Sequence, residues 1–270
     1  MVELFEQDIK TDNRQSSKGN QLKWQKKNEW YKADYTGYEG LAEYVVSGLL
    51  KLSSLDESEF VSYETEQIAY KFQRYRGCRS GNFLPEGWQL FTLERLFQSM
   101  YGQSLNRSIY SIRDYKYRIR FLVEQTERMT GLSDFGEYVS KLLTIDALFL
   151  NEDRHTHNIA VLRDEKNQFH LCPFFDHGAA LLSDTAMDYP MGVETERLIQ
   201  AAKAKTFCQD FEEQLECAEQ LYGRQLTFRF NRNDVQRLLD KEQNYPPEIR
   251  ERVMEILVTQ RRKYQYLFVE

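Results

Sequence analysis

The chain has 270 residues, of which 36 are lysine or arginine and 42 are aspartate or glutamate, so its formal net charge at pH 7 is −6. This length is sufficient to bury a sizeable core, either as one large domain or as two closely joined lobes. The acidic balance argues against a surface that coats nucleic acid, and we expect no direct nucleic-acid binding.

Neither the first residues nor the apolar segments indicate export or membrane insertion. Residues 1–6 contain no basic segment followed by an apolar one, and no apolar run approaches the length of a membrane span. The cysteines have no metal-binding spacing, and outside a secretory context we expect free thiols. They are Cys78, Cys172, Cys208 and Cys217. We therefore expect a cytoplasmic protein that does not bind membranes.

A small polar loop follows residues 1–15, which are themselves polar and which we expect to be loosely held. The loop is Ser16-Ser17-Lys18-Gly19-Asn20. Exposed backbone N–H groups of such a loop can surround the phosphates of a nucleotide. The alternative is an ordinary hairpin turn, which a loop with a single glycine would favour if it stood alone.

Two predicted strands and a helix follow this loop. Residues 21–25 alternate between polar and apolar, and a second strand over 30–35 carries Lys32. Residues 41–52 have the periodicity of a helix, and this helix carries Glu43. Taken singly, Lys32 could be a strand lysine that extends to solvent and Glu43 a solvated helix residue. A functional role for the two residues is supported by their order along the chain, because both precede the polar segment 151–178 described below.

Further strands and then helices are expected along the rest of the chain. The turn-rich segment 76–82 is a predicted hinge between two lobes. Ser133 is a predicted N-cap. Strands are expected over 60–64, 67–74, 159–162 and 169–175, and helices over 92–101, 112–130 and 133–150, with three more after Glu194, the last over 248–267.

The segment 151–178 is the most informative part of the chain. An apolar run leads into a polar loop that holds Asp153 and, five positions later, Asn158. Two short apolar strands then lead to Asp176, and a hairpin would bring the three side chains to one place. Phosphoryl transfer from ATP requires such a set. A carboxylate must lie beside the acceptor hydroxyl, and an amide oxygen and a second carboxylate must hold Mg²⁺.

Two other interpretations of this segment remain open. All the histidines of the chain accompany these carboxylates: His155, His157, His170 and His177. A metal-dependent hydrolase could use imidazole and carboxylate ligands for Zn²⁺ or Fe²⁺, although no helical H-E-x-x-H spacing is present. Alternatively, a turn rich in asparagine and aspartate only caps backbone groups, and the histidines are solvated.

In these features the chain resembles the HipA-like serine/threonine kinases, whose fold is related to protein kinases and phosphatidylinositol kinases. The matching elements span residues 16–178. They are the Ser/Gly loop before Lys23-Trp24, the strand Trp30-Tyr31-Lys32, helical Glu43-Tyr44, Asp153-x-His155-x-x-Asn158 and Pro173-x-x-Asp176.

The resemblance implies a role for each matching residue. Lys32 would contact the ATP phosphates, and Glu43 would be its ion-pair partner. Asp153 would be the catalytic base, and Asn158 and Asp176 would hold Mg²⁺. The remaining nucleotide-binding residues would be Ser16, Ser17, Gly19, Asn20 and His155. Arg154 could stabilise developing charge or bind a phosphorylated residue, or it could form only a structural salt bridge.

The resemblance also implies an α+β, bilobal protein-kinase-like fold. We expect a small antiparallel-sheet N-lobe with one helix over 16–80, and a mainly helical C-lobe over 81–270 with the catalytic loop and the metal site. The expected activity is ATP-dependent phosphorylation of protein serine or threonine, with Mg²⁺ or Mn²⁺ as the metal. The alternatives are a small-molecule or lipid kinase of the same fold and an inactive nucleotide-binding regulator.

Two expectations concern partners and regulation. The chain is too short for the extra N-terminal subdomain with which full-length HipA toxins contact an antitoxin, so it resembles the compact, single-chain branch of the family. HipA-like kinases phosphorylate a serine of the nucleotide loop. A phosphate on Ser16 or Ser17 would repel the ATP phosphates, so the protein's substrates could include the chain itself.

Overall fold

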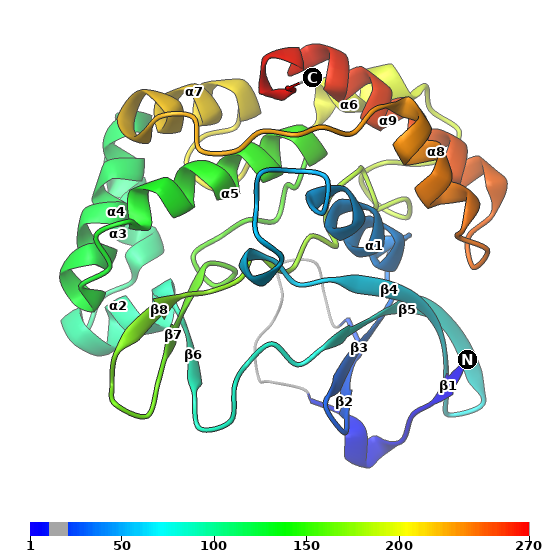
Figure 1. Ribbon diagram of the computed structural model, residues 1–270, viewed down its shortest axis with the longest axis horizontal. Helices are drawn as coiled ribbons and strands as arrows, with labels where there is room; N and C mark the ends of the chain where they lie inside the picture. The colour runs from blue at the N-terminus through cyan, green and yellow to red at the C-terminus, as the bar shows by residue number, and fades with distance from the viewer. Residues whose placement is uncertain (11–20, 270) are drawn as a thin grey trace. The chain divides into compact units, whose positions relative to one another are not determined.

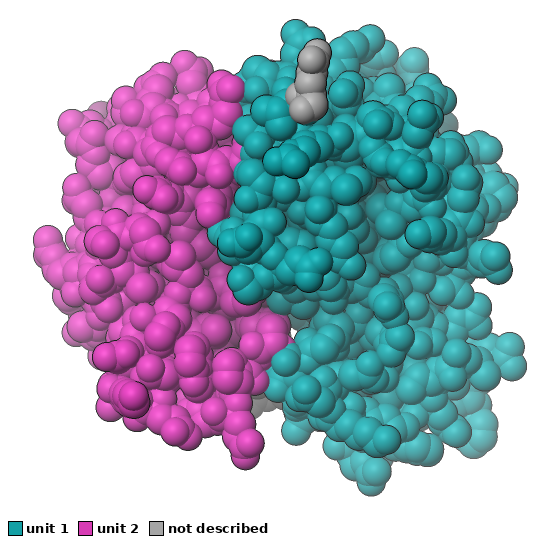
Figure 2. All heavy atoms as spheres, in the orientation of Figure 1, with its two compact units in different colours: residues 1–82, 176–202, 227–270 teal, residues 83–175, 203–226 magenta. Residues whose placement is uncertain are grey.

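The computed structural model describes residues 1–10 and 21–269, and its elements are labelled in Figure 1. The nucleotide loop expected at Ser16, Ser17, Gly19 and Asn20 lies outside the described residues. The chain divides into two compact units, coloured in Figure 2. Unit 1 comprises residues 1–82, 176–202 and 227–270, and unit 2 comprises residues 83–175 and 203–226.

Unit 1 contains a five-stranded sheet in the order β1-β4-β5-β3-β2. Its neighbouring strands are antiparallel except for the parallel pair β1 and β4. The strands are β1 (Val2–Glu3), β2 (Lys23–Lys26), β3 (Glu29–Ala33), β4 (Tyr63–Tyr70) and β5 (Gln73–Gly81). Helix α1 (Glu39–Leu50) packs on β4 and β5, as Figure 1 shows.

Period-2 alternation explains how this sheet buries one face. Alternate residues of a strand point to the same side, so Tyr31 and Ala33 of β3 and Ile68 and Tyr70 of β4 all reach one core. Trp24 lies fully buried among them, and its ring contacts that of Tyr70 edge-on at 5.3 Å between centroids. The strands predicted at 21–25 and 30–35 are therefore present, with boundaries shifted by one or two residues.

The break predicted between two strands and the turn-rich structure predicted for 76–82 are both wrong. The structure has one long hairpin, β4–β5, which turns at Lys71 and Phe72. Both residues have positive φ, 47° and 64°, as a two-residue type I′ turn requires, although neither is glycine or asparagine. The predicted hinge at 76–82 lies almost entirely inside β5. Its glycine, Gly77, allows backbones to approach, because a Cβ there would lie 2.0 Å from the carbonyl oxygen of Lys32.

The first ten residues are not loosely attached, which corrects the expectation for their part of 1–15. Val2 and Glu3 pair with Ile68 and Ala69 of β4, and Leu4 is 2 % exposed within the sheet core. A short 3-10 helix over Glu6–Asp8 follows. Polar composition concealed this edge strand, because only alternate residues of an edge strand need to be apolar.

Unit 2 combines an antiparallel sheet, β6-β7-β8, with a group of helices. Helix α5 is buried along nearly all of its length and packs against α4 and α7. The predicted helix over 133–150 is confirmed, but Asp134 rather than Ser133 flanks its start. The elements are β6 (Gln89–Thr92), β7 (Ala160–Arg163), β8 (Phe169–Leu171), α2 (Leu93–Tyr101), α3 (Leu105–Ser111), α4 (Tyr115–Thr130), α5 (Phe135–Phe149) and α7 (Phe211–Tyr222).

The remaining helices belong to unit 1: α6 (Thr195–Ala201), α8 (Arg232–Asp240) and α9 (Pro247–Lys263). Together with α7, four described helices thus follow Glu194, where three were predicted. The lobe boundary expected after residue 80 lies beside the division after residue 82, whereas 176–202 and 227–270 group with unit 1 rather than with unit 2. Within the described residues no helix is long and apolar enough to cross a membrane.

Candidate functional site

Lys32, Glu43 and Asp176 meet in unit 1 from three separate segments of the chain. The Lys32 Nζ lies 2.6 Å from Glu43 Oε1 and 2.7 Å from Asp176 Oδ1. The backbone N–H of His177 donates to the other carboxylate oxygen of Glu43, Oε2, at 2.8 Å. The structure thus brings together three of the residues that we assigned to the nucleotide and the metal.

Close packing of α1 on the sheet positions Glu43. A Cβ at Gly40 would lie 2.4 Å from the carbonyl carbon of Gly77, so only glycine permits this contact between α1 and β5. Glu43 follows Gly40 by three residues and therefore lies on the same face of the helix. Lys32 pairs across the sheet with Cys78, the neighbour of Gly77. The two glycines therefore set the approach of the helical carboxylate to the strand lysine.

The three charges are largely removed from water. The side chain of Glu43 is 1 % exposed and that of Lys32 is 14 % exposed. Burial opposes the charge of Lys32, but the carboxylates of Asp176 and Glu43 outweigh it and hold the pKa of Lys32 well above its usual value. The ring of Tyr63 lies 5.3 Å from the Lys32 Nζ and adds a cation–π contact. Lys32 is therefore a permanent cation at neutral pH.

Asp176 has a positive φ, which is uncommon among non-glycine residues. Its φ is 63°, in the left-handed region that most non-glycine residues avoid. Such strain persists only where surrounding contacts enforce it, and it is frequent at functional sites. Here the ion pair with Lys32 fixes the side chain, and the bond from the next residue, His177, to Glu43 fixes the backbone.

In unit 2, the loop with Asp153 and Asn158 begins directly after α5. Leu150, with a φ of 56°, ends the helix in the left-handed conformation. The N–H of Asn151 then donates to the carbonyl oxygen of Asp146 at 2.9 Å, and its side-chain amide donates to the Asp146 carboxylate at 2.8 Å. The last turn of α5 therefore holds the start of the loop.

Arg154 forms a buried ion pair that organises this loop. Its Nε lies 3.0 Å from Asp146 Oδ2, and the two side chains are 1 % and 0 % exposed. Burial raises the pKa of Asp146, while Arg154 acts in the opposite direction. The Arg154 Nη1 also donates to the carbonyl oxygens of Asn158 and Phe175, at 3.2 and 3.1 Å. Among the roles considered for Arg154, this geometry favours the structural salt bridge.

Asp153 and Asn158 are linked within the same loop. The Asn158 Nδ2 donates to the backbone oxygen of Asp153 at 2.9 Å, and the Asn158 N–H donates to the backbone oxygen of His155 at 2.8 Å. Because the amide nitrogen of Asn158 is engaged, its Oδ1 is the end that can serve as a metal ligand. The Asp153 carboxylate is 18 % exposed and the His155 ring 28 % exposed. A carboxylate with access to solvent can accept a proton from an acceptor hydroxyl.

The positions of His170 and His177 do not support the hydrolase alternative. The ring of His170 stacks on Trp88, with 4.5 Å between centroids, and its Nε2 lies 3.1 Å from Asp164 Oδ2. His177 is fully buried in unit 1. Across residues 1–10 and 21–269, no group of three or more His, Cys, Asp and Glu side chains is placed to hold a metal ion.

Sequence reasoning missed Asp146, although it left a signal. Asp146 is an acidic residue within the apolar run that precedes the loop, and it lies eight positions before Arg154. A charged residue in a buried helix is rare unless it is paired. That rule alone would have indicated a buried cation nearby.

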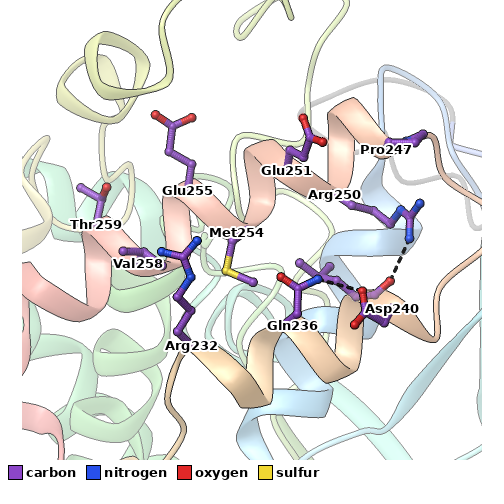
Figure 3. Close-up of a pocket in the computed structure, with 11 residues that line it drawn as sticks. Arg232, Gln236, Asp240, Pro247, Arg250, Glu251, Met254, Glu255, Val258 and Thr259 are labelled. Carbon is purple, nitrogen blue, oxygen red and sulfur yellow. Dashed lines mark hydrogen bonds between the residues drawn. The ribbon is translucent and has the colours of Figure 1, made fainter.

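A surface groove of about 520 Å³ lies between α8 and α9 in unit 1 (Figure 3). Its walls carry both signs of charge: Arg232 lies on α8, whereas Arg250, Glu251 and Glu255 lie on α9. None of the predicted site residues lines this groove. The groove is therefore not a candidate for the catalytic site.

Comparisons with known proteins add evidence on the fold. No protein-family model and no curated protein sequence matches the chain. Among solved structures, it is similar to the crystal structure of a Helicobacter pylori proinflammatory kinase, CtkA, with a TM-score of 0.56. The alignment covers 91 % of this chain and 88 % of that chain. The chain has a kinase-like fold. At 17 % sequence identity, the likeness extends to the fold alone.

Proposed function

We propose that the chain is an ATP- and Mg²⁺-dependent kinase that phosphorylates serine or threonine of proteins and is related to the HipA-like kinases. The observation that carries the proposal is the buried contact of Lys32 with Glu43 and Asp176 within a kinase-like fold. A lysine held by a helical glutamate, together with a metal-binding aspartate, is the arrangement that protein kinases use for phosphoryl transfer. A lysine in a sheet without these two carboxylates would not indicate a kinase.

Each residue has a distinct task in this proposal. Lys32, which remains protonated, binds the phosphates of ATP, and Glu43 holds its ammonium in position. Asp176 and Asn158 offer the hard oxygen ligands that Mg²⁺ prefers. When bound, Mg²⁺ neutralises charge on the phosphates. Asp153 accepts the proton of the substrate hydroxyl. We choose Mg²⁺ because the proposed ligands are a carboxylate oxygen and an amide oxygen, and such ligands favour Mg²⁺ over zinc.

In this proposed function, Asp146 and Arg154 position other residues of the site. Neither side chain can reach solvent, so neither binds substrate directly. The guanidinium of Arg154 fixes the backbone of Asn158 and of Phe175, and Asp176 is the residue that follows Phe175. This single cation therefore positions one proposed metal ligand and the peptide that leads to the other. Precise placement of such groups accounts for much of the rate enhancement in phosphoryl transfer.

Mass spectrometry after incubation of the purified protein with Mg-ATP tests the proposed function. The mass of a phosphoryl group should appear on the protein itself or on an added protein substrate, and not in an Asp153→Ala variant. Transfer only to an added small molecule or lipid would identify the alternative kinase. ATP that binds and is returned intact would identify an inactive regulator.

Phosphorylation of the nucleotide loop is a further part of the proposal. Mapping of phosphopeptides should place a phosphate on Ser16 or Ser17 after incubation with ATP. A phosphoserine carries about −1.5 to −2 charges, which would oppose binding of the ATP phosphates. An unmodified loop in a preparation that phosphorylates another substrate would exclude this mode of self-inactivation.

A further inference from the structure

The segment 203–207 is attached to the loop of Asp153 on both sides of that residue. The backbone N–H of Lys203 donates to Glu152 Oε1 at 2.9 Å. The hydroxyl of Thr206 donates to the backbone oxygen of Arg154 at 2.7 Å. Glu152 and Arg154 are the two sequence neighbours of Asp153, and all of these residues belong to unit 2. The segment is therefore fixed beside the proposed catalytic base.

Helices of unit 2 hold the same segment from its other side. The hydroxyl of Tyr110 donates to the backbone oxygen of Lys205, and Arg118 donates to that of Phe207. The N–H of Phe207 donates to Gln214 Oε1 at 3.0 Å. These bonds hold the backbone of the segment in place.

Two lysines of this segment are exposed, whereas the residues that follow each of them are buried. Ala204 and Thr206 are buried, whereas Lys203 and Lys205 are exposed. This alternation of exposed and buried residues places both lysines on the solvent side of the segment. Among the residues that the structure describes, neither lysine forms an ion pair. Lys203 and Lys205 thus place two exposed cations two positions apart in a protein whose net charge is −6.

An aromatic and basic surface continues from these lysines onto α3 and α4. Tyr110, which binds Lys205, is 46 % exposed. The guanidinium of Arg118 lies 5.0 Å from the ring of Tyr110 and 5.0 Å from that of Tyr115. Aromatic and arginine side chains are enriched where proteins bind other proteins. We call Lys203, Lys205, Tyr110 and Tyr115 the basic ledge.

We propose that the basic ledge binds acidic side chains of the phosphoryl acceptor, so that the chain phosphorylates serine or threonine within acidic protein segments. This inference rests on the proposed function and specifies its substrate class. Charge complementarity supports it, because the backbone that carries the two exposed lysines is bonded to both neighbours of Asp153, and neither lysine forms an ion pair within the described part of the chain. In an acidic protein, a local cationic site also attracts acidic segments that the rest of the surface repels.

The first test compares two serine peptides that differ only in whether glutamate or glutamine flanks the acceptor. We expect wild-type kcat/KM to be roughly 5- to 30-fold higher for the glutamate peptide. This ratio should fall to near one in Lys203→Gln/Lys205→Gln and should reverse in Lys203→Glu/Lys205→Glu. Because each ratio is taken within one variant, general damage to the enzyme cancels.

A matched control carries the same change in net charge elsewhere. Lys166→Glu/Lys241→Glu replaces two other exposed lysines, and the wild-type ratio should persist in it. An equal ratio in wild type and in the ledge variants would overturn the proposal, as would the same loss of the ratio in the control.

A binding experiment separates failure of this proposal from failure of the proposed function. Fluorescence anisotropy of the labelled glutamate peptide requires no phosphoryl transfer. Its affinity should weaken with added salt and with Lys203→Gln/Lys205→Gln. Absence of lysine-dependent binding would overturn the ledge even in an active kinase. Tighter, lysine-dependent binding of a single-stranded oligonucleotide would also overturn it and would identify a nucleic-acid surface.

Discussion

Lys32 and Asp176 are separated by 144 residues in the sequence, yet the Lys32 Nζ lies 2.7 Å from Asp176 Oδ1. The same Nζ lies 2.6 Å from Glu43 Oε1, so one ammonium group serves two carboxylates. Without the lysine, two buried or partly buried anions would face each other. The contact should therefore contribute both to the stability of the fold and to phosphoryl transfer. The two contributions can be measured separately.

Lys32→Met should abolish phosphoryl transfer and destabilise the fold. Loss of a group that stabilises transition-state charge lowers the rate by at least about 100-fold. Removal of one partner from a buried ion pair costs about 3–5 kcal/mol, because the other charge stays buried. Steady-state phosphoryl transfer and urea unfolding measure the two effects.

The double variant Lys32→Met/Glu43→Gln is the matched control. It removes the buried negative charge and keeps an oxygen that can accept the bond from the His177 N–H. We expect it to regain part of the lost stability and none of the activity. A double variant less stable than Lys32→Met would show that Glu43 is not the source of the cost.

Asp153→Asn should lose phosphoryl transfer while the fold and nucleotide binding are retained. The loop uses the backbone oxygen of Asp153, not its carboxylate, to bind Asn158. The substitution therefore removes the proposed base without removing that contact, and we expect a loss of roughly 100-fold or more in kcat. Calorimetric titration with ATP provides the control for binding. Turnover close to wild type would exclude Asp153 as the base.

Much of the fold follows from patterns that act over short distances. Alternation predicted the strand that carries Lys32 and the strand before it, and helical periodicity predicted the helix that carries Glu43. The order of strand lysine, helical glutamate, loop aspartate and later aspartate indicated a kinase-like fold, which the comparison with CtkA supports. These features depend on local propensity and burial, which a sequence records directly.

Other features depend on contacts between distant segments. The β4–β5 hairpin turns at Lys71 and Phe72, where no glycine or asparagine indicates positive φ. Gly77 resembled a turn residue, but its role is close packing against the strand of Lys32. The return of residues 227–270 to unit 1 involves a bridge between Ser53 and Phe228, which local sequence does not record.

The Asp146–Arg154 pair should be one of the main supports of unit 2. Asp146→Ala leaves a fully buried guanidinium without its carboxylate, and we expect a loss of about 3–5 kcal/mol in the free energy of unfolding. Asp146→Asn keeps an oxygen acceptor for Arg154 and should lose less. Urea unfolding of both variants tests this order. Equal stabilities for wild type and Asp146→Ala would show that the pair contributes nothing.

A partly buried carboxylate near the start of α1 should make stability depend on pH. Asp34 Oδ1 accepts from the N–H of Gly40 at 2.7 Å, and Oδ2 accepts from the hydroxyl of Tyr245 at 2.8 Å. Burial, with a smaller contribution from Glu39, raises the pKa of Asp34 to about 7, while the two hydrogen bonds act in the opposite direction. Asp34 therefore binds its proton more tightly in the folded chain than in the unfolded one.

Because the pKa of Asp34 is higher in the folded chain than in the unfolded one, the folded state should lose stability as pH rises. The stability that protonated Asp34 contributes is complete below its unfolded pKa, near 4, and is lost as pH rises through about 7. In Asp34→Asn the group cannot ionise; the amide oxygen can still accept from the N–H of Gly40, and the amide NH₂ can instead donate to the hydroxyl oxygen of Tyr245. Relative to this variant, the wild type should lose about 2–3 kcal/mol between about pH 5 and about pH 8. Thermal unfolding of both proteins across that range measures the difference. If the gap between their unfolding temperatures does not change with pH, Asp34 keeps its ordinary pKa in the folded chain.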